Sequence, residues 1–261
     1  GLGDVYKRQG EKQQLHITKL PPLPMPLDNL SATYADGCLY VAGGKGKPQT
    51  VPIGKDGSQT APTNPLFSLQ LTPSLQKEWV RLPDFPGPAR VQPVLTAQQS
   101  EDGIRLYLAG GFQPASAHQE AIVCTDMLSY HPKTKQWRNE GFLPSLAGGS
   151  HRTVTGGCAI ASGDSSILLV GGVNYDRFRD ALNHPEPDYL LHPADWYKFN
   201  TSLLQYNTFT KHWTHLGNYE ELARAGAGIA NNANTVIIIG GELKPGIRTP
   251  EVNAFKLTCH P

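Results

Sequence analysis

Four short apolar runs, each ending at a pair of glycines, dominate the hydrophobic pattern of this 261-residue chain. They are CLYVAGG (38–44), RLYLAGG (105–111), ILLVGG (167–172) and TVIIIGG (235–241). Unbroken apolar runs of this length, rich in β-branched and aromatic residues, are typical of strands buried on both faces. A Gly pair at the end of such a strand indicates a sharp turn or a close approach of two backbones. The pattern therefore predicts four repeats of one structural unit.

Each apolar run is flanked by further segments with the period of a strand. An alternating segment precedes every run: LSATYA (30–35), RVQPVLTA (90–97), HRTVTGGCAIA (151–161) and RAGAGIA (224–230). In the second and third units a hairpin follows, with Tyr130 seven residues before Trp137 and Tyr206 seven residues before Trp213. Four strands per unit form the blade of a β-propeller.

The recurring combination of apolar run, Gly-Gly, loop and Tyr-x6-Trp resembles the kelch family over roughly residues 20–258. This resemblance implies an all-β, kelch-type β-propeller with about four four-stranded blades of a six-bladed ring. Residues 11–261 are expected to form this propeller, and the chain stops after the third strand of the fourth unit, so the last two blades are expected to be missing. Residues 1–10 look like a translated cloning tail and are expected to be non-native.

Composition narrows the classes of partner. The formal net charge is +1, and no segment concentrates basic residues, which argues against nucleic acid. No apolar run approaches the roughly 20 residues that a membrane helix needs, and no secretory signal is visible. The four cysteines have no metal-like spacing, and the three that fall in strand-like segments are expected to be small buried residues. Oligomeric state and redox compartment stay open.

The chemistry is expected in the loops after the Gly pairs and before the first strands, because in a propeller these loops surround one mouth of the central channel. Long structured loops in a compact domain are usually functional. Polar residues that occur at these two points are Asn29, Arg90, His151, Arg224, Lys45, Gln113, Asn174 and Glu242. In the fourth unit, a turn at Pro245-Gly246 would fold Arg248 back toward Glu242. A carboxylate and a guanidinium over a channel can move a proton and bind an anionic sugar.

The segment GELKPGIRT (241–249) is similar to the signature of the N-acetylneuraminate epimerase family, also called cyclically permuted mutarotases. The resemblance implies an isomerase that interconverts the α and β anomers of sialic acid, with Glu242 as catalytic base and Arg248 as its catalytic partner, which holds the substrate carboxylate. Other parts of the chain also fit family positions: GGVNYDRF (171–178), GPAR (87–90), His151 and the stretches 188–189 and 197–200.

Substrate-binding residues are then expected at Arg90, His151, Asn174 and Arg224. The family implies no cofactor or metal, an acidic sugar as the small-molecule partner and a periplasmic location. The insertion at 45–62 and the missing blades depart from its pattern.

Each of these residues also has a purely structural interpretation. Glu242 and Arg248 could form a loop ion pair, His151 could be a core histidine, Arg90 and Arg224 could be solvated loop charges, and Asn174 could cap a turn. The histidines and carboxylates of HPEPDYLLHPADW (184–196) match no metal-ligand spacing. The alternative function is a non-catalytic kelch module that docks a protein or glycan. A copper oxidase of galactose-oxidase type would need a set of Tyr and His ligands that the sequence does not offer.

Overall fold

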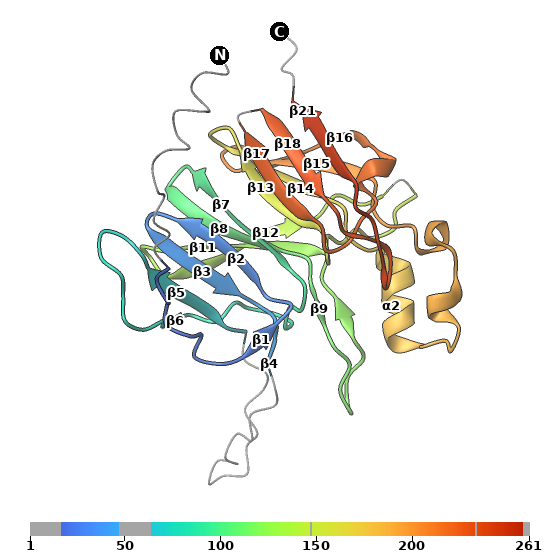
Figure 1. Cartoon of the computed structure of the whole chain (residues 1–261), viewed down its shortest axis with the longest axis horizontal. Helices are drawn as coiled ribbons and strands as arrows, with labels where there is room; N and C mark the ends of the chain where they lie inside the picture. The colour runs from blue at the N-terminus through green and yellow to red at the C-terminus, as the bar shows by residue number, and fades with distance from the viewer. Residues whose placement is uncertain (1–16, 47–63, 147, 233, 258–261) are drawn as a thin grey trace, which may run out of the picture.

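The computed structural model describes residues 17–46, 64–146, 148–232 and 234–257, and it arranges them as four neighbouring antiparallel sheets (Figure 1). The tail at residues 1–10 and nearly all of the insertion at 45–62 lie outside the described residues. Blades 1, 2 and 3 have four strands, and blade 4 has three. The predicted all-β propeller of four consecutive blades is confirmed.

In every blade the strands follow one another in sequence order, from the innermost strand beside the propeller axis to the outermost strand, which we call the rim. The strands are β2 (Ser31–Ala35), β3 (Cys38–Ala42), β5 (Leu66–Gln70) and β6 (Val80–Leu82) in blade 1; β7 (Val94–Ser100), β8 (Gly103–Ala109), β11 (Asp126–His131) and β12 (Gln136–Phe142) in blade 2; β13 (Cys158–Ser162), β14 (Ser166–Val170), β15 (Ser202–Asn207) and β16 (His212–Asn218) in blade 3; and β17 (Gly228–Asn232), β18 (Thr235–Ile239) and β21 (Val252–Lys256) in blade 4. Strand β7 contacts β2 on one side and β13 on the other, and β13 contacts β17. The first strands therefore surround the propeller axis.

The second strand of a blade is buried on both faces, as its apolar run predicted. In β14, Ile167 and Leu169 pack into the core shared with blade 2, whereas Leu168 and Val170 pack into the core shared with blade 4. All four side chains are at most 2% exposed. The hydrophobic cores thus lie between blades, so each blade is stabilised by its neighbours.

The Gly pairs mark the places where neighbouring blades touch backbone to backbone. Gly171 has a φ of 67°, and a Cβ on it would lie 2.6 Å from the carbonyl oxygen of Arg224. The amide of Gly172 donates to that same oxygen at 2.8 Å. A side chain at Gly171 would therefore push blades 3 and 4 apart, and one at Gly172 would collide with the carbonyl oxygen of Thr155, 2.7 Å from its Cβ, within blade 3.

The predicted aromatic hairpins are confirmed at the rim. Tyr130 pairs with Trp137 across β11 and β12, with ring centroids 5.0 Å apart. Tyr206 pairs with Trp213 across β15 and β16, at 4.7 Å. Aromatic pairs at these distances stabilise a hairpin beyond the area that they bury.

A small element follows the Gly pair of each blade on the same side of the fan. Blades 1, 2 and 4 have two-stranded ribbons, and blade 3 has a helical insertion (Figure 1). These elements are β1 (Leu27–Asp28) with β4 (Lys45–Gly46), β9 (Phe112–Gln113) with β10 (Ile122–Val123), β19 (Glu242–Lys244) with β20 (Ile247–Arg248), and α2 (Tyr175–Asn183), η2 (Tyr189–Leu191) and η3 (Ala194–Tyr197). A further turn, η4 (Glu220–Leu222), precedes β17. Within the described ranges, no helix has the length and apolar character needed to cross a membrane.

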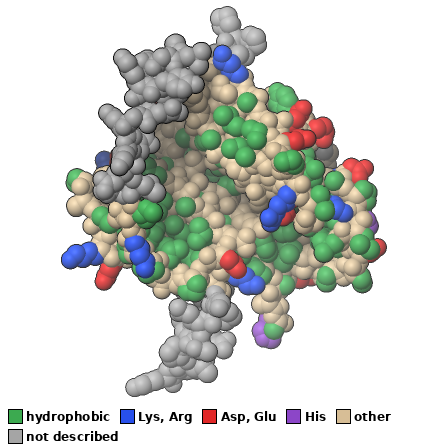
Figure 2. Space-filling view, in the orientation of Figure 1, with side chains coloured by type: hydrophobic (Ala, Val, Ile, Leu, Met, Phe, Trp, Pro, Cys, Tyr) green, Lys and Arg blue, Asp and Glu red, His purple; other side chains and the backbone are tan. Residues whose placement is uncertain are grey.

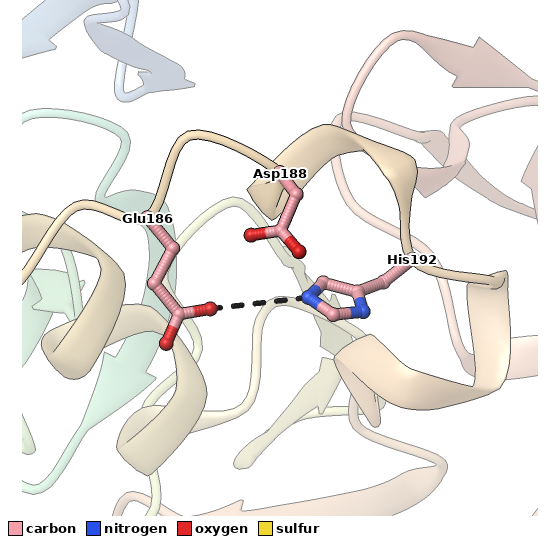
Figure 3. A group of neighbouring side chains, drawn as sticks. All are labelled: Glu186, Asp188 and His192. Atoms are coloured by element: carbon pink, nitrogen blue, oxygen red, sulfur yellow. Dashed lines mark ion pairs between the residues drawn. The ribbon is translucent and has the colours of Figure 1, made fainter.

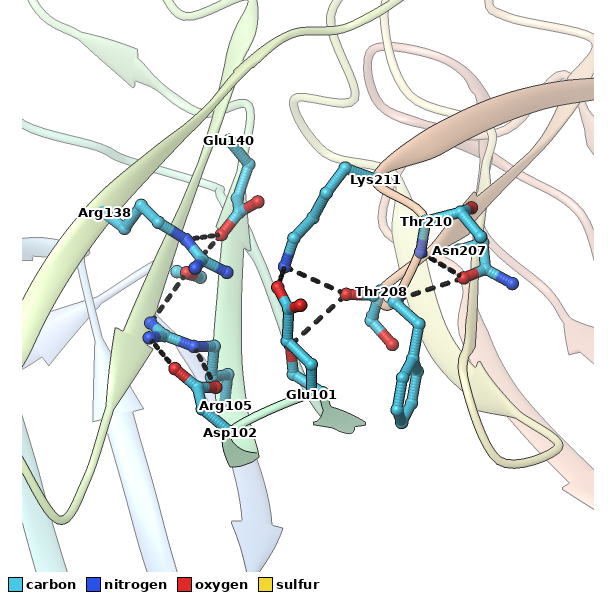
Figure 4. Close-up of polar contacts among 12 residues, drawn as sticks. Glu101, Asp102, Arg105, Arg138, Glu140, Asn207, Thr208, Thr210 and Lys211 are labelled. Atoms are coloured by element: carbon cyan, nitrogen blue, oxygen red, sulfur yellow. Dashed lines mark hydrogen bonds and ion pairs between the residues drawn. The ribbon is translucent and has the colours of Figure 1, made fainter.

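Charged side chains also connect blades 2 and 3 at the rim (Figure 4). The buried carboxylate of Glu140 accepts hydrogen bonds from Ser129 at 2.5 Å, Arg138 at 2.7 Å and Tyr206 of blade 3 at 2.8 Å. Burial raises the pKa of Glu140, but these three donors outweigh burial and the net pKa is lowered. Glu140 therefore stays ionised within the fold. Nearby, Lys211 of blade 3 pairs with Glu101 of blade 2 at 3.0 Å.

Two of the three cysteines that the structure describes are buried as expected, and the third is only partly buried. Cys38, Cys124 and Cys158 are free, and the last two are buried. Burial raises the pKa of the Cys124 and Cys158 thiols to about 11, so both are inert at neutral pH. Cys259 lies outside the described residues.

Candidate functional site

Four residues with left-handed backbone conformation, one from each blade, form a hydrogen-bonded chain around the propeller axis. Asn29, Gln92, Gly156 and Gly226 have φ of 52°, 55°, 69° and 63°. The amide of Gln92 donates to the Asn29 carbonyl at 2.9 Å, that of Gly156 to Gln92 at 3.0 Å, and that of Gly226 to Gly156 at 2.7 Å. We call these four residues the axial chain. Because it joins the starts of successive blades, it fixes the positions of the segments beside it.

The axial chain holds the hairpin of strands β19 and β20 in place. Ala225, beside Gly226, exchanges two backbone hydrogen bonds with Glu242, at 2.7 and 3.0 Å. The turn at Pro245-Gly246 then reverses the chain, with Gly246 at a φ of 79°. The reversal pairs Glu242 with Arg248 in the β19–β20 register. The predicted fold-back of Arg248 onto Glu242 is confirmed.

Glu242 and Arg248 form a loose and accessible ion pair. The Nε of Arg248 lies 3.4 Å from Oε1 of Glu242, at the long end of hydrogen bonding. The Arg248 side chain is 81% exposed and that of Glu242 is 29% exposed. Most of the guanidinium donors therefore face open space, and the carboxylate keeps acceptor capacity for another molecule.

Lys244 fastens the same hairpin to the helical insertion of blade 3. Its Nζ donates to the carbonyl oxygens of Leu190 and His192, at 3.1 and 2.6 Å. Farther along the insertion, the buried Asn200 amide donates to the backbone of Thr153 at 2.7 Å and of Val173 at 3.0 Å. The wall formed by the insertion is thus anchored to both blade 3 and blade 4.

The axial chain, the hairpin and the insertion line a cavity of about 630 Å³. This volume is in the range of small-molecule sites. The cavity is lined by Asn29, Leu30, Gln92, Pro93, Gly156, Gly157, Val173, Phe178, Tyr189, Phe199, Ala225, Gly226, Gly241, Glu242, Pro245 and Arg248. Its charged groups are Glu242 and Arg248, its uncharged amides are Asn29 and Gln92, and its aromatic wall comes from the insertion.

Arg90 and Arg224 are not on this wall, contrary to their predicted position at the opening. Each is at most 3% exposed, and each guanidinium bonds the carbonyl of the first glycine in its own blade's Gly pair. Arg90 also pairs with Asp126 at 2.8 Å, and Arg224 with Glu251 at 2.8 Å. The two arginines are therefore equivalent scaffold residues that tie the second strand of a blade to the third.

His151 and Asn174 also lie off the cavity lining. His151 is exposed and meets the ring of Tyr175 edge-on, with centroids 5.1 Å apart. Asn174 is the N-cap of α2, where its side chain accepts from the amide of Arg177 at 3.1 Å. This contact is the capping role that asparagine commonly has. Substrate contacts of these two residues stay predictions.

The insertion brings together three possible metal ligands, which Figure 3 shows. Glu186, Asp188 and His192 place one ligand atom each within 4.8 Å of one another. Both carboxylates are exposed, the Glu186–His192 separation is 3.9 Å, and the His192 ring stacks on Trp196 at 3.9 Å. Exposed groups of this kind are common without an ion. The expectation that this segment holds no metal stays a prediction.

Sequence reasoning overlooked several cavity residues. Gln92 and the glycines of the axial chain were not singled out as site residues, whereas Phe178, Tyr189 and Phe199 fall in stretches noted for their family resemblance. A signal was present: Asn29, Gln92, Gly156 and Gly226 occur at one equivalent point of each unit, a few residues before the first strand. On the face shown in Figure 2, side chains of both charge signs are interspersed, in line with the near-neutral composition.

Comparison with known proteins places these observations in a family. The family model described as N-acetylneuraminate epimerase matches residues 20–260. N-acetylneuraminate epimerase of Salmonella paratyphi B (strain ATCC BAA-1250 / SPB7) is 27% identical over 248 residues, which are 90% of this chain and 57% of that protein. The enzyme of the same name from Pasteurella multocida (strain Pm70) is 27% identical over 215 residues, covering 77% of this chain and 52% of that one.

The fold has a counterpart among solved structures. The structure of YjhT superposes with a TM-score of 0.68 at 23% identity, and the match covers 92% of this chain and 67% of that chain. This similarity supports the propeller fold. The chain spans little more than half the length of the curated relatives that it matches.

Proposed function

We propose, on the premise that the chain belongs to the N-acetylneuraminate epimerase family, that it carries the acid–base centre of an enzyme that interconverts the anomers of N-acetylneuraminic acid. The observation that carries this proposal is the position of Glu242 and Arg248 on one wall of the cavity. A carboxylate and a largely exposed guanidinium, 3.4 Å apart, suit a substrate whose anomeric carbon bears both a hydroxyl and a carboxylate.

In the proposed reaction Arg248 holds the carboxylate of the sugar. Its planar fork can donate to both carboxylate oxygens at once, and such charge-assisted pairs are stronger than neutral hydrogen bonds. This contact places the anomeric hydroxyl, attached to the adjacent carbon, beside Glu242. Arg248 would also stabilise negative charge that develops as the ring opens.

Glu242 then moves the proton. Its carboxylate takes the proton of the anomeric hydroxyl, the bond between the anomeric carbon and the ring oxygen breaks, and the ring oxygen receives a proton. Because both oxygens are attached to one carbon, the protonated Glu242 can reach the ring oxygen as well. The freed carbonyl rotates and the ring closes on its other face. Protons and electrons balance without a cofactor.

The required acceleration is modest. Sugar anomers exchange unaided in water, so the enzyme needs to lower an already accessible barrier. One well-placed acid–base residue contributes about 10²–10⁴-fold. A single carboxyl group with a positioning arginine therefore suffices for the reaction.

A concave cavity of about 630 Å³ favours an enzyme over a docking module. A module that docks a protein would present aromatic side chains across a broad, shallow face. The exposed aromatic residues include Tyr34, Phe142, Phe209 and Tyr219, which lie at separate points of blades 1, 2 and 3 or of the loop that follows.

By family resemblance, we also propose a periplasmic location beside sialic-acid uptake.

The experiment that tests the function follows the anomers directly. The full-length protein is added to N-acetylneuraminic acid freshly released as its α anomer, and the approach to equilibrium is followed by proton NMR. We expect exchange well above the spontaneous rate, and no acceleration for glucose, which has no carboxylate. An exchange rate equal to that in buffer would refute the proposal.

A further inference from the structure

Gln92 is held in a backbone conformation that its side chain disfavours. It belongs to the axial chain, where blades 3 and 4 use Gly156 and Gly226 at a left-handed φ and blade 1 uses Asn29. Glycine adopts this conformation without penalty and asparagine tolerates it, but other residues with a Cβ are strained there. Strained residues of this kind concentrate at functional sites, so the outlier calls for an explanation.

The Gln92 side chain makes few polar contacts with the described residues. It lines the cavity, and its one side-chain contact among the described residues runs from Nε2 to Oδ1 of Asn29 at 3.5 Å, the limit of a hydrogen bond. Its Oε1 leans toward blade 3, because a Cβ built on Gly156 would lie 3.6 Å from it. The amide is thus extended over the axial chain with a donor and an acceptor available.

We propose that Gln92 is a substrate-binding and specificity-determining residue of this cavity, whose amide hydrogen-bonds the uncharged polar substituents of the acidic sugar. This inference rests on the proposed function. Glu242 and Arg248 come from blade 4 and engage the carboxylate end, whereas Gln92 comes from blade 2, two positions away along the axial chain. Hydroxyl and acylamino groups both donate and accept, and a primary amide matches either.

The test compares Gln92→Gly with Gln92→Met in the full-length protein. Gln92→Gly removes the amide and relieves the left-handed strain, so we expect Tm to rise by about 2–4 °C while KM for N-acetylneuraminic acid rises about 3- to 10-fold. Gln92→Met keeps the length of the side chain and the backbone constraint but removes the amide. We expect the same rise in KM without the rise in Tm.

Lys135 provides the matched control. It has a φ of 58° in the exposed turn between β11 and β12, away from the cavity. Lys135→Gly should raise Tm as Gln92→Gly does and leave KM unchanged. If both Gln92 variants keep the wild-type KM, Gln92 does not bind substrate and the inference is wrong. Absence of exchange in the wild-type protein would instead refute the proposed function itself, so the two failures are distinguishable.

Discussion

Glu140 at the rim and Glu242 at the cavity each pair with an arginine, but the two carboxylates have opposite surroundings. The Glu140 side chain is 3% exposed and accepts from three side chains at 2.5–2.8 Å, and Figure 4 shows its contact with Arg138. The Glu242 side chain is 29% exposed and, among the described residues, has one side-chain hydrogen bond, at 3.4 Å, with an arginine that is 81% exposed. The rim carboxylate has its hydrogen-bonding capacity filled by the fold, whereas the cavity carboxylate retains capacity for a ligand.

This contrast gives a criterion for separating structural from functional charges in the propeller. Arg90 and Arg224 belong with Glu140, because their guanidinium groups are buried and paired within their own blades. Glu242 and Arg248 belong to the other class. Breaking a structural pair should lower the stability of the fold and leave activity unchanged. Changing a cavity residue should lower activity and leave stability unchanged.

The largest effect is expected at Glu242. Glu242→Gln removes the base but keeps the shape and the backbone hydrogen bonds to Ala225. We expect the enzyme-catalysed anomer exchange to fall about 10²–10⁴-fold, measured by the NMR time course, with Tm unchanged. Exchange at the wild-type rate would show that another group moves the proton.

Glu140→Ala should lower the stability of the fold and leave anomer exchange unchanged. It leaves the Tyr206 hydroxyl and the Arg138 guanidinium without their shared acceptor, at a cost of about 3 kcal/mol in the free energy of unfolding and a fall in Tm of roughly 10 °C. Glu101→Ala is the control, because its pair with Lys211 is 57% exposed on the carboxylate side and contributes less than about 1 kcal/mol. Equal losses from the two variants would contradict the assignment of Glu140 as a structural charge.

Arg248→Ala is predicted to weaken binding of the sugar. Losing charge-assisted hydrogen bonds to the carboxylate should raise Kd about 10- to 100-fold, measured by calorimetry, with little change in stability. Arg81→Ala is the control and should leave Kd unchanged. Arg81 also forms an ion pair with a carboxylate, at 2.9 Å from Asp84, but it lies on blade 1. A normal Kd for Arg248→Ala would remove the proposed carboxylate contact.

The smallest effect concerns Lys244, which positions the hairpin without lining the cavity. Lys244→Met removes the two bonds to the insertion backbone and should lower kcat about 3- to 10-fold, with a smaller change in KM. Lys244→Arg keeps a charged donor and should restore part of kcat. If Lys244→Met changes only Tm, the contact is structural.

The sequence was sufficient for the parts of the molecule that depend on local pattern. The runs before the Gly pairs predicted the two-faced strands, the Tyr-x6-Trp spacing predicted the rim hairpins, and Pro245-Gly246 predicted the turn that brings Arg248 to Glu242. These features involve residues close together in the chain, where periodicity and turn propensity apply directly.

The burial of Arg90 and the backbone conformation of Gln92 could not be predicted in this way. Arg90 is buried because Asp126, 36 residues further on, lies opposite it in the folded blade. The left-handed φ of Gln92 follows from hydrogen bonds to Asn29 and Gly156, each more than 60 residues away. Such contacts are set by how blades stack around the axis, and a single sequence carries little record of that stacking.

The most direct test of the account is the crystal structure of the full-length Glu242→Gln protein with N-acetylneuraminic acid. We predict that the sugar occupies the cavity, with its carboxylate on Arg248 and its anomeric oxygen within hydrogen-bonding distance of residue 242. A sugar bound away from these two residues, or an empty cavity at saturating sugar, would contradict the claim that this pair is the chemical centre.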